Sequence, residues 1–149
     1  MKQSVSAMTW KTMWHSGFTN IIIDMLLERD PFAEASCMAL SLCEKHRIEG
    51  FVSISSVIDI YYLVRKYTHS TELAYKAVGK LLEIVKVCSV TNNDVLTAYQ
   101  RKARDFEDCL VATCAKSIHC DCIVTRNKKD FEEFDILPLT PEELLNQDS

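Results

Sequence analysis

Short runs of apolar and β-branched residues alternate along this chain with longer segments of helical periodicity. The runs are residues 51–54, 84–87, 122–125 and 136–139. Each run is followed by a helical segment or a tight turn, and strands that alternate with helices in this way favour a parallel sheet. The sequence therefore predicts an α/β fold in which helices cover both faces of a parallel sheet.

Helix signals are strong because only three glycines and three prolines interrupt the 149 residues. One apolar stripe at helical spacing follows Pro31, and a second lies within residues 110–118. Near the end of the chain, Thr140-Pro141-Glu142-Glu143 combines a capping box with proline at the first helical position. A last helix is expected to begin there.

Residues 1–18 are harder to assign. The aromatic and methionine residues of this segment, Met8, Trp10, Met13 and Trp14, fit a strand, a short helix or a loosely ordered arm. The segment lacks the continuous aliphatic run that a buried central strand usually has. We therefore treat residues 1–18 as an atypical N-terminal segment, with a degenerate first strand as one interpretation, and the remaining residues 19–149 as one domain.

Composition predicts a cytoplasmic protein without a membrane segment. Hydrophobic residues make up 48% of the chain, which is enough for an ordinary core. No apolar run is long enough to span a bilayer, and the N-terminus does not read as a secretion signal. The seven cysteines are an odd number, so buried free thiols are expected rather than a disulfide framework.

The net charge of −4 gives no global attraction to nucleic acid. Local basic clusters nevertheless flank the acidic motifs, and these clusters are candidates for contacts to phosphate. The basic residues concerned are Arg101, Lys102, Arg104, Arg126, Lys128 and Lys129.

Polar side chains stand at several predicted strand ends and helix starts. They are Asn20, Asp24, Asp59, Asp105, Asp108, Thr125, Asn127 and Asp130. Mg²⁺ and Mn²⁺ bind oxygen ligands that converge from separate elements, and the ends of strands in an α/β sheet are where such ligands usually meet. A metal-dependent enzyme is therefore the first hypothesis.

These acids also have structural explanations. Asp105 and Asp108 share one face of a helix start, where the helix dipole alone would account for either of them. Asp59 lies in an apolar helical segment, so we do not expect its carboxylate to be fully solvated, and a buried carboxylate needs a partner or a metal. A tyrosine hydroxyl or an arginine is the alternative partner.

Four segments in order resemble the PIN domain, in the subgroup related to bacterial toxin nucleases. They are residues 19–32, the helix entry of residues 53–66 with Asp59, the Asp105-Phe106-Glu107-Asp108 motif, and the turn of residues 124–131. The resemblance extends from residue 19 to about residue 145.

The resemblance implies a three-layer α/β/α sandwich whose carboxylates gather Mg²⁺ or Mn²⁺ to hydrolyse phosphodiester bonds in RNA, often as a homodimer paired with an antitoxin protein. It implies that Asp59 and Asp108 ligate the metal, with Asp105 and Asp130 as further metal-binding candidates, and that Asn127 or Asp130 holds a metal-bound water. Asp130 fits the cap of a turn equally well. The remaining implied roles are auxiliary positions at Asp105, Thr125, Asn20 and Asp24, and RNA contacts from Arg104, Arg126, Lys128 and Lys129.

The sequence departs from the family pattern at one position. PIN domains usually carry an aspartate directly before the Thr-Asn pair, at the end of the central strand, and this chain has Phe18 there. An aromatic ring cannot ligate a hard cation, so we expect low activity at most.

Three accounts of Phe18 stay open. The site is crippled and the domain binds RNA or a protein partner without cutting; Asp24 or another acid substitutes; or an altered start has displaced the native segment. A generic α/β phosphohydrolase or response-regulator-like domain would instead need an acidic strand end early in the chain, and the region of Phe18 offers none.

Overall fold

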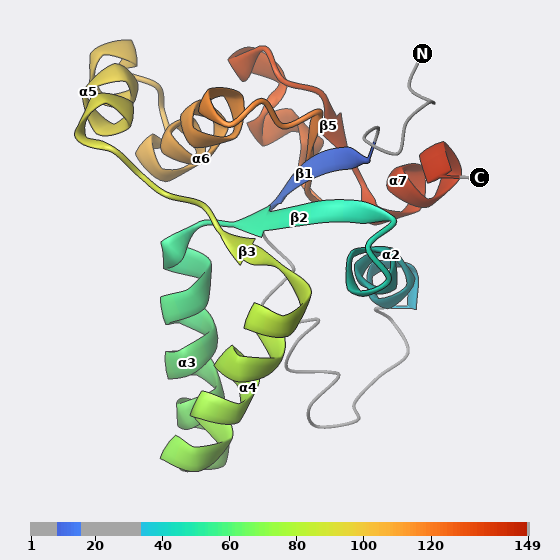
Figure 1. Cartoon of the computed structure of the whole chain (residues 1–149). Coiled ribbons are helices and arrows are strands. Elements are labelled where there is room, and N and C mark those ends of the chain that lie inside the picture. The colour runs from blue at the N-terminus through green and yellow to red at the C-terminus, as the bar shows by residue number, and fades with distance from the viewer. Residues whose placement is uncertain (1–8, 16–33, 149) are drawn as a thin grey trace.

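The computed structural model describes residues 9–15 and 34–148. In this part of the chain, five parallel strands form one sheet in the order β3-β2-β1-β4-β5 (Figure 1). The strands are β1 (Trp10–Trp14), β2 (Ile48–Val52), β3 (Lys86–Val87), β4 (Cys122–Val124) and β5 (Pro138–Leu139). The predicted parallel α/β fold is confirmed.

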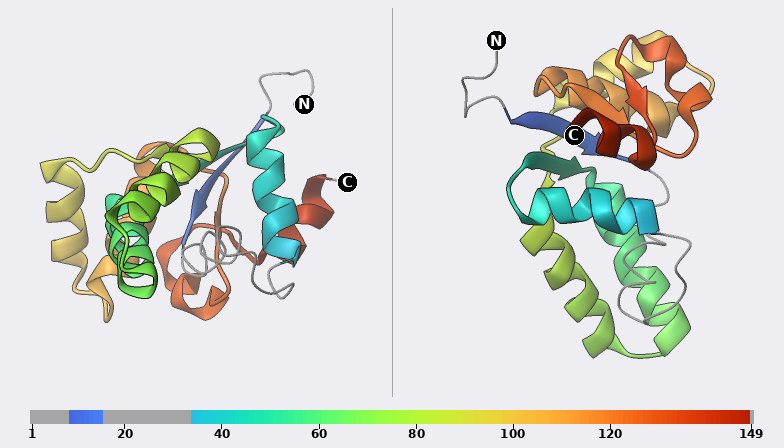
Figure 2. Two further views of the ribbon diagram at one scale, coloured as in Figure 1. Left: turned by 90° about the horizontal axis from the view of Figure 1, so that it is seen from below. Right: turned by 90° about the vertical axis from the view of Figure 1, so that its right-hand side faces the viewer.

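Helices cover both faces of this sheet, which makes a three-layer α/β/α sandwich (Figures 1 and 2). One apolar core joins the sheet to α2, α3, α4 and α7, and a second core joins its other face to α5 and α6. The helices are α2 (Glu34–Glu44), α3 (Ile54–Thr68), α4 (Thr71–Ile84), α5 (Asn92–Arg101), α6 (Phe106–Ser117) and α7 (Pro141–Asp148), with short 3₁₀ helices η4 (Lys128–Asp130) and η5 (Glu132–Phe134).

The central strand is β1, although its sequence is not the continuous aliphatic run that such a strand usually has. Thr12 and Trp14 point into one core and Met13 into the other, and all three are almost fully buried. The buried Thr12 hydroxyl donates to the Glu49 carbonyl at 3.0 Å and accepts from Trp14 Nε1 at 2.9 Å. Because its polar groups are paired in this way, the segment can occupy the middle of a sheet.

Lys11 is accommodated in the same strand by reaching toward polar groups outside the core. Its Nζ donates to the Ile118 carbonyl at 2.9 Å, and the same Nζ lies 5.6 Å from the ring centroid of Phe51. The aliphatic part of the side chain can therefore cover the sheet while the charge is satisfied.

The predicted capping box begins α7. The Thr140 amide donates to Glu143 Oε1 at 2.9 Å, and the Glu143 amide donates to the Thr140 hydroxyl at 3.1 Å. The seven cysteines are free thiols, and five of them are buried. Among the residues that the structure describes, no helix is long and apolar enough to cross a membrane.

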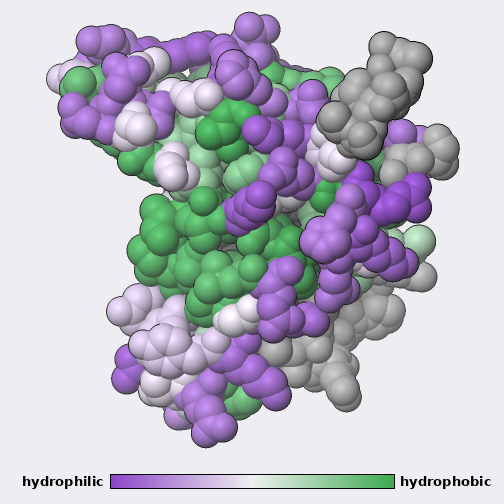
Figure 3. All heavy atoms as spheres, viewed as in Figure 1, coloured by the Kyte–Doolittle hydropathy of each residue, from purple (hydrophilic) through white to green (hydrophobic). Residues whose placement is uncertain are grey.

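Apolar side chains gather in the middle of one face of the molecule, over β3, the first turns of α3 and the end of α4 (Figure 3). On α3 the exposed apolar residues include Ile54, Ile58 and Tyr62. Their spacing of four residues places them on one stripe of the helix. We call these three residues the α3 stripe.

Two glycines offer a matched test of how closely β2 packs against its neighbours. A Cβ added at Gly50 would lie 2.8 Å from Cys43 Sγ and 3.0 Å from Val85 Cγ1, whereas one added at Gly79 would meet nothing within 4 Å. Gly50→Ala should therefore destabilise the protein by about 1–3 kcal/mol. Gly79→Ala, within α4, should stabilise it by about 0.5–1 kcal/mol. Urea unfolding followed by tryptophan fluorescence measures both, and equal effects would contradict the described contact between β2 and its neighbours.

Candidate functional site

The strand order places the switch point of the sheet between β1 and β4. The chain runs outward from β1 to β2 and β3 on one side, and from β4 to β5 on the other. Ligands of open α/β sheets bind at the carboxyl ends of the strands at such a point. The residues directly after these two strands are His15 and Thr125, and the His15 amide donates to the Val124 carbonyl at 2.9 Å.

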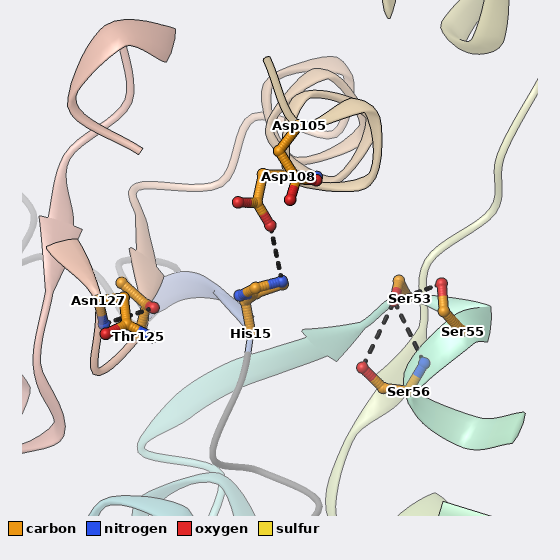
Figure 4. A network of polar contacts seen from close by, with 8 residues as sticks. All are labelled: His15, Ser53, Ser55, Ser56, Asp105, Asp108, Thr125 and Asn127. Atoms are coloured by element: carbon orange, nitrogen blue, oxygen red, sulfur yellow. Dashed lines mark hydrogen bonds and ion pairs between the residues drawn. The ribbon is translucent and has the colours of Figure 1, made fainter. Parts of the chain in front are cut away.

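The first turn of α6 brings a carboxylate to the same place. Asp105 is the N-cap of this helix and accepts a hydrogen bond from the Asp108 amide at 2.9 Å. Asp108 is buried, and its Oδ1 lies 3.2 Å from His15 Nε2. Figure 4 shows His15 beneath the start of α6, between the turn that holds Thr125 and Asn127 and the serine-rich head of α3.

Asp108 is in an environment that opposes its ionisation. Burial is the largest cause, and the neighbouring acids Asp105, Asp130 and Glu107 add to it, so that the pKa of Asp108 rises to about 6. Like charges around a partly desolvated carboxylate raise its pKa because the ionised form is less favourable there. A perturbed carboxylate at a switch point is a functional-site signal.

His15 is uncharged at neutral pH in this setting. Burial lowers its pKa below the ordinary 6.5, although Glu107, Asp105 and Asp130 act in the opposite direction. Its ring packs edge-on against Phe131, with centroids 4.8 Å apart. Its Nδ1 is buried and has no hydrogen-bond partner among the described residues. The contact with Asp108 is therefore a polar contact of a neutral imidazole and not an ion pair.

An open cleft of about 420 Å³ lies beside this contact. It presents acids from the head of α6 and from η4 together with two cations. Its lining residues are Arg104, Asp105, Asp108, Lys129, Asp130, Glu133 and Phe134. We call it the acidic cleft.

The turn after β4 forms as the sequence predicts. Thr125 is buried, and its hydroxyl accepts from the Asn127 amide at 3.1 Å. The Thr125 amide donates to the Leu139 carbonyl at 2.8 Å, which ties the turn to β5. Asn127 itself is exposed and directly precedes η4, whose last residue is the exposed Asp130.

The apolar sequence neighbours of Asp59 do not bury it. Asp59 is exposed on α3, because the helix faces the core through Ile60 and Val64. Its apolar sequence neighbours include residues of the exposed α3 stripe, so a nearly continuous apolar sequence does not identify the core-facing side. Asp59 is not among the described residues that line the acidic cleft beside Asp108.

Two of the four predicted RNA-contacting cations are engaged by α7. Lys128 Nζ lies 3.0 Å from Glu143 Oε2, and Arg126 Nη1 lies 3.9 Å from Glu142 Oε2. Hydrogen bonding at the Thr140 cap, followed by the contact with Lys128, lowers the pKa of Glu143. The other two predicted cations line the acidic cleft.

The acids of the cleft suit a hard cation in chemical type. Within residues 9–15 and 34–148, no three His, Cys, Asp or Glu side chains converge on one point as a closed metal cage. Mg²⁺ is commonly bound by one or two carboxylates together with waters and substrate phosphates, and the oxygens of Asp108, Asp105 and Asp130 fit such an open site. The predicted residues Asn20 and Asp24, like Phe18, lie outside the described residues.

Sequence reasoning missed His15. His15 directly follows β1 and lies on the same side of the strand as Met13. The sequence did not predict this position, because a strand was one of three interpretations of the N-terminal segment. Alternation along a central strand ending at Trp14 would have pointed to it.

The comparisons agree with this architecture. The sequence profile of the PIN domain matches residues 19–129. The chain therefore belongs to the PIN domain family, whose members are in general nucleases. The match includes the head of α6 and the turn after β4, and β1 with His15 precedes it. A search of curated proteins found no match to the chain.

The raised pKa of Asp108 predicts how stability depends on pH. The folded protein keeps a proton on Asp108 up to about pH 6, whereas the ordinary value is 3.8. Between these values the folded state binds more protons, so the contribution of Asp108 to the free energy of unfolding falls as the pH rises. Asp108→Asn should therefore be more stable than wild type by about 2 kcal/mol at pH 7.5. At pH 4 this gain in stability should be smaller, because Asp108 of the wild type is then largely protonated in the folded state.

Urea unfolding of both proteins at the two pH values measures this difference. His15 contributes with the opposite sign, because its pKa is lowered, so the comparison is made between variant and wild type at each pH. A difference that does not change between pH 4 and pH 7.5 would contradict the prediction.

Proposed function

We propose that this protein is a PIN-type endoribonuclease that depends on Mg²⁺ or Mn²⁺. The observation that carries the proposal is the buried Asp108 carboxylate at the switch point, surrounded by other acids beside an open cleft. A site that concentrates negative charge against its own stability is suited to bind a cation.

Asp108 would hold the cation, with Asp105 and Asp130 as neighbouring oxygen donors. Asp59 joins them by the resemblance to PIN domains, and its exposure on α3 leaves the carboxylate available. Asn127 or Asp130 would orient a water. A divalent cation supplies an activated water and neutralises charge on the phosphate oxygens when it is bound.

The cationic side chains of the acidic cleft would contact the RNA backbone. Lys129 and Arg104 line the acidic cleft, where a phosphate would approach the acids. Lys128 and Arg126 would contribute less, because each is near a glutamate of α7. Such contacts position a flexible single strand without reading its sequence.

Asp108→Asn should abolish metal-dependent cleavage of single-stranded RNA. The variant loses the charge that holds the cation, and a loss on the order of 100-fold or more is expected. The assay is cleavage of a fluorescent RNA with millimolar Mn²⁺, with and without EDTA. Asp135→Asn is the matched control, because that side chain is 94% exposed and its backbone φ of 55° suits asparagine. Equal activity of wild type and Asp108→Asn would refute the assignment.

Lys129→Gln should weaken RNA binding more than Lys128→Gln. Lys129 lines the cleft, whereas the Lys128 charge is already paired with Glu143. Loss of one phosphate contact should reduce the slope of log K against log salt by about 0.7 for a single strand. Fluorescence anisotropy of labelled RNA in EDTA, which prevents cleavage, gives both quantities. Identical losses for the two variants would show that the cleft is not the RNA path.

A catalytically silent PIN-like module that binds RNA or a protein is the second candidate function. It is favoured by Phe18 in the sequence and by the contact of His15 with the carboxylate that would ligate the metal. Metal titration separates the two functions. If millimolar Mn²⁺ neither raises the melting temperature nor produces cleavage, the nuclease proposal fails and the silent module stands.

The proposal includes a toxin-type role with an antitoxin partner and a homodimer, as the resemblance implies. The exposed α3 stripe supports an interface of some kind, because contiguous apolar surface commonly marks one. Light scattering after size-exclusion chromatography tests the homodimer, and a purely monomeric protein would remove that part of the proposal.

A further inference from the structure

Most PIN domains carry an acid at the end of the central strand. By sequence the position is Phe18, but the residue that follows the central strand β1 is His15. Its imidazole meets Asp108 at the switch point (Figure 4).

The spacing of the two side chains suits a shared cation. His15 Nε2 and Asp108 Oδ1 are 3.2 Å apart. Nitrogen and oxygen ligands lie about 2.1 Å from a first-row divalent ion, so two neighbouring ligands at roughly a right angle are about 3 Å apart. A cation can therefore be accepted between these atoms with little change in their separation.

The imidazole is held in place from two sides. The His15 amide is bonded to the Val124 carbonyl, and the ring packs edge-on against Phe131. Its side chain is 18% exposed and that of Asp108 is 12% exposed, so both are held by their surroundings, and Asp108 also lines the acidic cleft. A ligand fixed by packing on a rigid strand gives a site its geometry.

We propose that His15 is a metal ligand of this protein, which supplies through Nε2 the ligand position at the end of β1 and makes the site favour Mn²⁺ over Mg²⁺. The inference rests on the proposed function. Imidazole nitrogen suits transition metals, whereas Mg²⁺ requires oxygen donors and Mn²⁺ accepts both kinds of ligand. A histidine ligand beside the acids would thus shift the metal preference towards Mn²⁺.

The test is Mn²⁺ binding by the full chain, followed by electron paramagnetic resonance. Bound Mn²⁺ should show ¹⁴N coupling in spin-echo spectra, and the coupling should change when the protein carries ¹⁵N-labelled histidine. This comparison needs no substitution, so it does not depend on the folding of a variant. An unchanged spectrum on labelling would overturn the inference.

Two substitutions extend the test. His15→Gln should lose the nitrogen coupling and weaken Mn²⁺ binding on the order of tenfold or more. His15→Asp should lose the coupling and gain affinity for Mg²⁺ relative to Mn²⁺. His69→Asn is the matched control, because His69 is exposed and its φ of 56° suits asparagine.

The outcomes distinguish this inference from the proposed function. If Mn²⁺ binds and Asp108→Asn removes it, but nitrogen coupling is absent or survives in His15→Gln, the role of His15 is refuted and the metal site at Asp108 stands. If wild type binds no Mn²⁺ at millimolar concentration, the metal site and the role of His15 both fail.

Discussion

The site depends on the packing of the first turn of α6 across the carboxyl end of β1. Asp105 fixes the start of the helix by capping the Asp108 amide, and this places the Asp108 carboxylate beside His15. Because β1 is hydrogen-bonded to strands on both sides, His15 is held by the most constrained part of the sheet. The relation between helix head and strand end therefore follows from the fold itself.

Asp108 is the electrostatically strained residue of the site, and it is also the residue to which we assign the metal in the proposed function. Burial and three neighbouring acids disfavour its charge, and neutral His15 does not offset that cost. Nearby cations are partly committed elsewhere, since Lys128 is paired with Glu143 on α7. The fold tolerates this unfavourable charge because the sandwich is stabilised by two separate apolar cores.

Local signals in the sequence were sufficient for the parallel sheet and for the start of α7, because strand composition, helix spacing and capping involve residues close in sequence. Local signals were not sufficient to assign β1. Burial of its polar residue Thr12 depends on hydrogen bonds to Glu49 and Trp14 that form only in the folded protein. The exposed position of Asp59 was not predicted, since apolar neighbours along a helix do not define which side meets the core. His15 escaped notice because its partner Asp108 is distant in sequence and adjacent only after folding.

The strand order has a consequence for biosynthesis. β1 is the first described strand to leave the ribosome, yet one of its two partners in the sheet is β4, and α6 precedes β4 only narrowly. Contacts of such long range form late because a large loop must close before they contribute. A nascent chain that has not yet reached β4 thus has no assembled acidic cleft, and the proposed action on RNA would have to wait until that strand has been made.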